Sequence, residues 1–276
     1  MRDVLPVLAN SFVLLLALVG AVLLWRLVLS PAARARPAAS ALAAWEAPGI
    51  DLFVFLFAVV TGSFLFSLGG GLVTRSFGLV GDLRTVVHGA AAQLGMLAGV
   101  AAFWLQLRQG PLPPPPPPAD SLRTGVIAFL VALPLLLATA KLWELGLSAC
   151  GLPVEKQDLV GMFANADSPW VLAGMIVLAV VVAPLTEELV FRAGLFRFLR
   201  GRVPRWLALL GPALFFAMLH VNWSTLQGLA SLAPLVVLAV VFSLAYERTG
   251  HIGTPIVAHA CFNLNTILVI LSGAAR

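Results

Sequence analysis

The chain has 276 residues, of which 61% are hydrophobic and only 11% are charged, and its mean hydropathy is +1.01. Soluble domains carry about 25% charged residues, so this composition excludes an ordinary soluble domain and predicts an integral membrane protein. The net charge of +5 comes from basic residues that lie mostly between apolar runs, where we expect them to contact anionic lipid and to set the topology. The sequence lacks a basic surface with aromatic residues of the kind that binds nucleic acid.

Eight apolar runs follow one another along the chain. A hydrocarbon core of about 30 Å needs about 20 helical residues. The runs cover about residues 4–30, 50–73, 85–107, 124–149, 169–199, 206–221, 232–247 and 253–273. We therefore predict an all-α, polytopic membrane bundle with about eight transmembrane helices. The run at 169–199 is too long for one simple span, and Pro184, which has no N–H to donate, predicts a kink or break near Ala183.

The connectors between these runs carry the breakers and most of the charges. Six consecutive prolines within residues 111–118 predict a stiff polyproline II spacer, which we favour over a ligand for a proline-binding module. We divide the chain there into an N-terminal transmembrane scaffold, residues 1–123, and a second helical core, residues 124–276. The basic cluster RFLRGRVPR at 197–205 is expected to face the cytoplasm by the positive-inside rule.

Charged residues inside the second half need an explanation, because one charge at a helix centre in hydrocarbon costs about 2.5–3.5 kcal/mol on insertion scales. The segment APLTEELVFRAG contains Glu187, Glu188 and Arg192 within one long apolar run. Glu188 and Arg192 are spaced i, i+4 and can pair on one helix face. Glu187 lies about 100° around the helix, next to Phe191 at i+4, and has no partner on its own helix. It is therefore a candidate general base or ligand.

Two further segments carry polar groups at helical spacing. Phe216 and His220 are spaced i, i+4 in FFAMLHVN, and His259 and Asn263 have the same spacing in HACFN. An imidazole and a carboxamide on one face can donate hydrogen bonds to a developing oxyanion. Taken singly, these residues fit a structural ion pair, core histidines or polar contacts between membrane helices. Taken together, they favour one polar site formed by three helices.

These residues resemble the three signature motifs of the CPBP family of intramembrane proteases. The motifs are Glu187-Glu188-xxx-Arg192, Phe216-xxx-His220 and His259-xxx-Asn263, in that order. The family comprises CAAX-protease and bacteriocin-processing (Abi) proteins related to the Rce-type CAAX prenyl endopeptidase. The resemblance covers about residues 170–272 and implies hydrolysis of a peptide bond inside a bacterial inner or plasma membrane. Many members have Gly after the motif arginine, whereas this chain has Ala193 there and Gly194 one position later.

The resemblance also implies a role for each motif residue. Glu187 and His220 would hold and activate water, and His259 and Asn263 would stabilise the oxyanion. Glu188 with Arg192 would order the site, and assistance to the water is an alternative role for Glu188. Phe191 and Phe216 are expected to contact substrate.

The need for a metal stays open. Without an HExxH motif, the site has either no cofactor or a Zn²⁺ ion held by Glu187, His220 and His259, and we favour a glutamate-activated water. The expected partners are the lipid bilayer and a membrane-associated, possibly prenylated, peptide or protein; no nucleic acid is expected. Two alternatives are kept: a non-catalytic immunity or scaffold protein of the same family, and a transporter or proton relay.

Overall fold

The protein is all-helical in the part of the chain that the computed structural model describes, with turns but no strand. The described residues are 4–35, 40–43, 45, 48–107, 118–152, 163, 166, 168–223 and 226–274. Seven helical segments within them are long and apolar enough to cross a membrane. They are Val4–Leu29, Gly49–Ser76, Gly81–Gln106, Asp120–Ala149, Pro169–Arg200, Gly228–Thr249 and Gly253–Leu271. The predicted polytopic α-helical architecture is confirmed, and the protein is an integral, multi-pass membrane protein.

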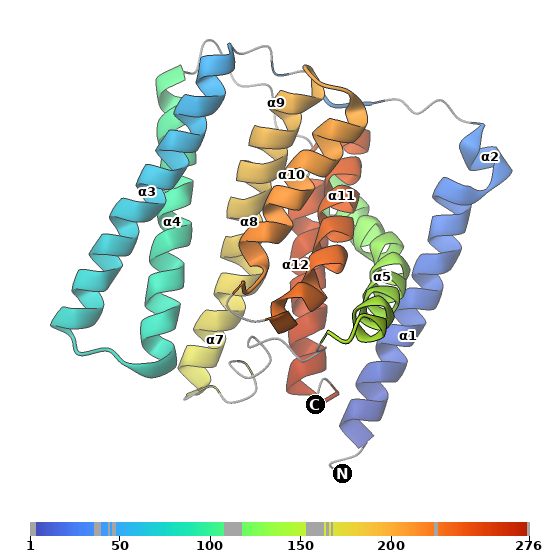
Figure 1. Cartoon of the computed structure of the whole chain (residues 1–276), viewed down its shortest axis with the longest axis horizontal. Coiled ribbons are helices and arrows are strands. Elements are labelled where there is room, and N and C mark those ends of the chain that lie inside the picture. Colours follow the sequence, from blue (N-terminus) through green and yellow to red (C-terminus); the bar gives the residue numbers. More distant parts are fainter. Residues whose placement is uncertain are drawn as a thin grey trace.

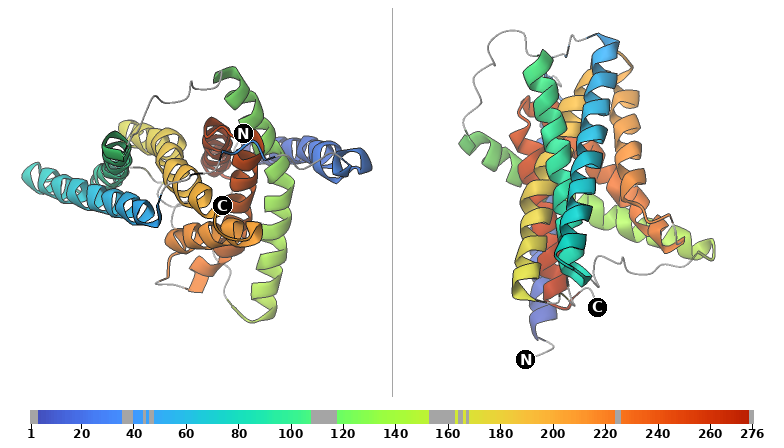
Figure 2. Two further views of the ribbon diagram at one scale, coloured as in Figure 1. Left: turned by 90° about the horizontal axis from the view of Figure 1, so that it is seen from above. Right: turned by 90° about the vertical axis from the view of Figure 1, so that its left-hand side faces the viewer.

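The helices are labelled in chain order. They are α1 (Val4–Leu24), η1 (Trp25–Leu29), α2 (Pro31–Arg34), α3 (Gly49–Ser76), α4 (Gly81–Leu107), α5 (Pro118–Ala149), α7 (Pro169–Val177), η2 (Leu178–Val182), α8 (Ala183–Glu188), η3 (Leu189–Phe196), α9 (Arg197–Arg200), α10 (Arg205–His220), η4 (Leu226–Ser231), α11 (Leu232–Thr249) and α12 (Gly253–Leu271). The hairpin of α3 and α4 lies at one side of the bundle, α1 and α5 lie at the other, and α7 to α12 lie between them (Figure 1). The view from above shows the same order (Figure 2).

The run at 206–221 forms α10, whose 16 residues are fewer than a simple span needs. This helix starts at the same end of the bundle as α9 and ends beside α8 (Figure 1). Because His220 is the last residue of α10, the short length of the helix puts this imidazole at the level of α8 instead of at the far membrane surface.

The long run around Pro184 remains helical, but its winding changes on both sides of α8. Residues Leu178–Val182 and Leu189–Phe196 are π-helical, and the short α-helix α8 lies between them. Pro184 is in the first turn of α8 and has no N–H to donate to the preceding turn of η2, a situation that disturbs helical winding. The predicted kink near Ala183 therefore appears as a change from π to α winding. Such wide turns occur often at functional sites.

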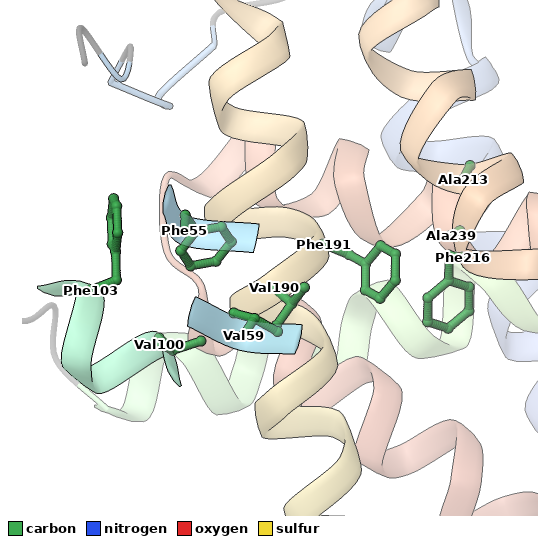
Figure 3. Close-up of a cluster of buried hydrophobic side chains, with 9 residues drawn as sticks. All are labelled: Phe55, Val59, Val100, Phe103, Val190, Phe191, Ala213, Phe216 and Ala239. Atoms are coloured by element: carbon green, nitrogen blue, oxygen red, sulfur yellow. The ribbon is translucent and has the colours of Figure 1, made fainter. Parts of the chain in front are cut away.

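Buried apolar side chains join the two halves of the bundle. Figure 3 shows Val190 on the side of its helix that faces Phe55 and Val59, and Phe191 on the side that faces Phe216. Gly194 packs against the ring of Phe55 so closely that a Cβ there would lie 2.4 Å from the ring. The segment that carries Glu187 is therefore fixed between α3 on one side and α10 on the other.

The proposed division of the chain at residue 123 remains a prediction. Residues 108–117, with most of the proline run, lie outside the described residues. Pro118 begins α5, so the predicted boundary at 123 falls within this helix.

The α3–α4 hairpin depends on backbone contact at small residues. A Cβ at Gly62 would lie 2.2 Å from the carbonyl oxygen of Gly95, as expected where small residues let membrane helices approach. We expect Gly62→Leu to separate α3 from α4 and to lower the thermal unfolding temperature in detergent. Gly69→Leu is the matched control on the same helix, because a Cβ there meets no other described atom within 4 Å. Equal unfolding temperatures for the two variants would contradict this packing.

Candidate active site

The three predicted motifs meet at one place. Glu187 comes from α8, His220 from the end of α10 and His259 from α12. The Oε2 atom of Glu187 lies 3.5 Å from Nε2 of His220 and 3.8 Å from Nε2 of His259. The side chain of Glu187 is 12% exposed and that of His220 is 34% exposed. The carboxylate thus points toward both imidazoles, and the cluster is open at the edge formed by His220.

A buried ion pair lies behind this cluster. Oε1 of Glu188 accepts a hydrogen bond of 2.9 Å from Nη1 of Arg192, and both side chains are buried. Nη2 of Arg192 also donates to the carbonyl oxygen of Ala239 at 3.2 Å. The same Oε1 atom of Glu188 lies 2.8 Å from Nδ1 of His259. The i, i+4 pair predicted from the sequence is therefore present, and it is linked directly to an imidazole of the site.

The hydrogen bonds also define how the two imidazoles face Glu187. Nδ1 of His259 donates to the Glu188 carboxylate, and Nδ1 of His220 donates to the carbonyl oxygen of Phe216 at 2.7 Å. In a neutral ring whose Nδ1 carries the proton, Nε2 is an acceptor. When both rings are neutral, two Nε2 atoms and one carboxylate oxygen therefore converge as acceptors. A water molecule, which donates two hydrogen bonds, is a chemically suitable partner for such a group.

Aromatic rings pack around the polar groups. The ring of Phe216 lies 4.2 Å from that of His220 and 4.9 Å from the guanidinium of Arg192. Phe191 packs edge-on against Phe216, with ring centroids 5.1 Å apart. Phe191 and Phe216 are only 7% and 1% exposed, so here they support the imidazole and the ion pair. Their predicted contact with substrate remains a prediction.

Asn263 follows His259 by one helical turn, but the structure gives it a different partner. Its Nδ2 atom donates to the carbonyl oxygen of Ala179, in η2, at 2.7 Å. A carboxamide nitrogen carries two N–H groups, so one donor is used in this contact and a second is left for the site. Its predicted role at the oxyanion stays untested.

Comparison with known proteins identifies the part of the chain that contains this site. Residues 169–265 match the model of the family described as "Type II CAAX prenyl endopeptidase Rce1-like". This segment of the chain is Rce1-like. The resemblance predicted from the three motifs is confirmed, and the Rce1-like segment, which starts at the first residue of α7 and ends within α12, contains every motif residue.

A curated protein of Escherichia coli, the "Uncharacterized 24.3 kDa protein", is similar to part of the chain. The two are 31% identical over 113 residues, which are 40% of this chain and 50% of that protein. The chain therefore spans about half the length of this relative. No solved structure matches the chain.

One residue of the site comes from outside the Rce1-like segment. Gln93 of α4 lies with its amide nitrogen 3.5 Å from Oε1 of Glu187. Gln93 lies in the segment that was predicted to be an N-terminal scaffold, and it is not one of the predicted site residues. Its carboxamide stands out in an otherwise apolar run and could have indicated a role. No helical spacing relates Gln93 to the motifs of the second half, so the sequence does not connect it with the site.

Whether the predicted zinc ligands hold a metal ion stays a prediction. Among the described residues, no group of three or more His, Cys, Asp or Glu side chains is arranged to hold a metal ion. Glu187, His220 and His259 converge, and the contact of His259 with Glu188 uses Nδ1 and leaves Nε2 available. The structure therefore leaves both the metal-free and the zinc alternative as predictions.

A second ion-pair cluster fixes the start of α10. The buried carboxylate of Glu247, near the end of α11, accepts a hydrogen bond of 2.7 Å from Nη2 of Arg205 and is also paired with Arg200. These contacts hold the turn between α9 and α10 against α11. Because α10 ends at His220, the cluster helps to determine where that imidazole lies.

Proposed function

We propose that this protein is an intramembrane endopeptidase that hydrolyses a peptide bond of a membrane-associated, prenylated or otherwise lipid-modified protein or peptide. The observation that carries the proposal is the carboxylate of Glu187 within 4 Å of two imidazoles from other helices. The match to the Rce1-like family supports a CAAX-protease type of membrane peptidase. The prenylated peptide as substrate class comes from the family's description.

The proposed reaction begins with a water held between Oε2 of Glu187 and Nε2 of His220. Glu187 takes a proton from this water, and the water oxygen attacks the carbonyl carbon of the substrate. The tetrahedral oxyanion accepts hydrogen bonds from His259, protonated at Nε2, and from the second N–H of Asn263. The C–N bond then breaks, and the proton held by Glu187 passes to the leaving amine. The products are a carboxylic acid and an amine.

Glu188 and Arg192 act in this scheme by positioning. The carboxylate of Glu188 accepts the Nδ1 proton of His259, which orients the ring and stabilises its protonated form. Arg192 compensates the charge of Glu188 in a region where neither side chain reaches water. In its protonated form, the His259 ring carries a proton on each nitrogen and donates from Nε2 when negative charge develops on the substrate oxygen.

The proposal is tested with purified protein in proteoliposomes and a quenched-fluorescent peptide that carries a farnesylated cysteine and a CAAX-type C-terminus. We expect the wild-type protein to cleave this peptide, and His259→Ala to reduce kcat by about 10²- to 10³-fold, as loss of an oxyanion donor does elsewhere. We also expect cleavage to persist in 1,10-phenanthroline, because the proposed mechanism is glutamic. His251→Ala is the control, since this imidazole belongs to none of the three motifs. Full cleavage by His259→Ala would refute the assignment.

A further inference from the structure

Helix α4 packs along one face against α7 and η2, the two elements that precede α8. A Cβ at Gly174 of α7 would lie 3.4 Å from Val86, and a Cβ at Gly89 would lie 3.0 Å from Leu178 of η2. Gln93 follows Gly89 by four residues and so lies on the same face of α4. The close approach at the glycine brings the Gln93 side chain to Glu187.

The orientation of the Gln93 carboxamide follows from its partner. An ionised carboxylate only accepts hydrogen bonds, so the amide nitrogen of Gln93 must face Oε1 of Glu187, as observed. The carbonyl oxygen of the same carboxamide then points away from the carboxylate. This Oε1 atom of Gln93 is buried and meets no hydrogen-bond donor in the described part of the chain. Buried acceptors without a donor are rare and unfavourable.

We propose that Gln93 has two functions in the reaction: its N–H orients the Glu187 carboxylate, and its carbonyl oxygen accepts a hydrogen bond from a backbone N–H of the bound substrate. This inference rests on the proposed peptidase function. A donation to Oε1 of Glu187 leaves Oε2 directed at the two imidazoles. A peptide supplies backbone N–H donors on both sides of the bond that is cleaved, and one of them satisfies the buried acceptor. The site therefore selects a peptide backbone over a chain that lacks this N–H.

The inference is tested with Gln93→Met, which keeps the length of the side chain and removes both polar groups. The matched control is Gln106→Met, the same change at an exposed position near the end of α4. We expect Gln93→Met to lower kcat/KM for the farnesylated peptide by roughly 10- to 100-fold, as expected for loss of hydrogen bonds that include one to a charged group. Gln106→Met should behave as the wild type.

Substrate analogues separate a hydrogen bond to substrate from a general structural effect. In two analogues, an ester oxygen replaces the N–H of the peptide bond on one or the other side of the cleaved bond, which is mapped by mass spectrometry. We expect one analogue to lose about tenfold in kcat/KM with the wild type and about twofold or less with Gln93→Met. Equal losses in both proteins, or none in the wild type, would overturn the inference.

The two proposals fail in different ways. If the wild-type protein does not cleave the farnesylated peptide, the peptidase function fails for this substrate class and the inference about Gln93 fails with it. If the wild type cleaves the peptide and His259→Ala does not, the peptidase function stands. In that case, wild-type kinetics for Gln93→Met would overturn the role of Gln93 alone.

Discussion

Replacement of Glu187 by glutamine is expected to lower the rate of peptide hydrolysis by about 10²- to 10⁴-fold, the range for loss of a general base. A carboxamide has nearly the shape of a carboxylate but cannot take a proton from water at neutral pH. The described contacts of Glu187 are the amide of Gln93 at 3.5 Å and the two imidazoles at 3.5 and 3.8 Å. The substitution keeps the size and shape of the side chain, so the variant should keep the unfolding temperature of the wild type. The measurement is kcat with the farnesylated peptide in proteoliposomes.

The matched control for this variant is Glu144→Gln on α5. Glu144 is 44% exposed and pairs with Lys141 one helical turn away, and exposed pairs of this kind contribute little. Its substitution should leave both kcat and stability unchanged. A kcat of Glu187→Gln within about twofold of that of Glu144→Gln would mean that another group activates the water.

The part of the site that could be predicted from the sequence is the part set by helical geometry. Residues four positions apart on a helix share a face, and this rule alone predicted the Glu188–Arg192 pair that is observed at 2.9 Å. It also predicted that Phe216 and His220 lie together, as their ring distance of 4.2 Å confirms. The convergence of the three motifs was implied by the family resemblance and by the cost of isolated charges in lipid.

Other parts of the site depend on how distant helices pack, which no local spacing reveals. Gln93 reaches Glu187 only because α4 approaches η2 at a glycine. Asn263 was predicted to act with His259 on the oxyanion. In the structure, its amide nitrogen donates a hydrogen bond to the carbonyl oxygen of Ala179 in the π-helical segment η2. The π winding itself was anticipated only as a kink at Pro184. The run at 206–221 was predicted as a span, and only the structure reveals that α10 is a helix of 16 residues that ends beside α8.

Arg192→Met is expected to reduce the free energy of unfolding by about 3–5 kcal/mol, because it breaks a buried ion pair on one side only. Glu188 is fully buried, and its Oε2 atom has no hydrogen-bond partner among the described residues. Without the guanidinium, the carboxylate would retain only the contact of its Oε1 atom with Nδ1 of His259. The carbonyl oxygen of Ala239 would also lose the donor that Arg192 provides. The measurement is equilibrium unfolding in mixed detergent micelles.

The double variant Glu188→Gln/Arg192→Met distinguishes this charge effect from a loss of packing. Removing the carboxylate charge as well should restore part of the stability. The decrease in unfolding free energy of the double variant should therefore be smaller than the sum of the decreases of the two single variants by about 0.5–3 kcal/mol. Hydrolysis should not recover, because His259 no longer has a carboxylate beside Nδ1 to stabilise its protonated form. Additive losses would contradict the coupling. Recovery of both stability and activity would mean that the ion pair serves the fold alone and that the orientation of His259 has another source.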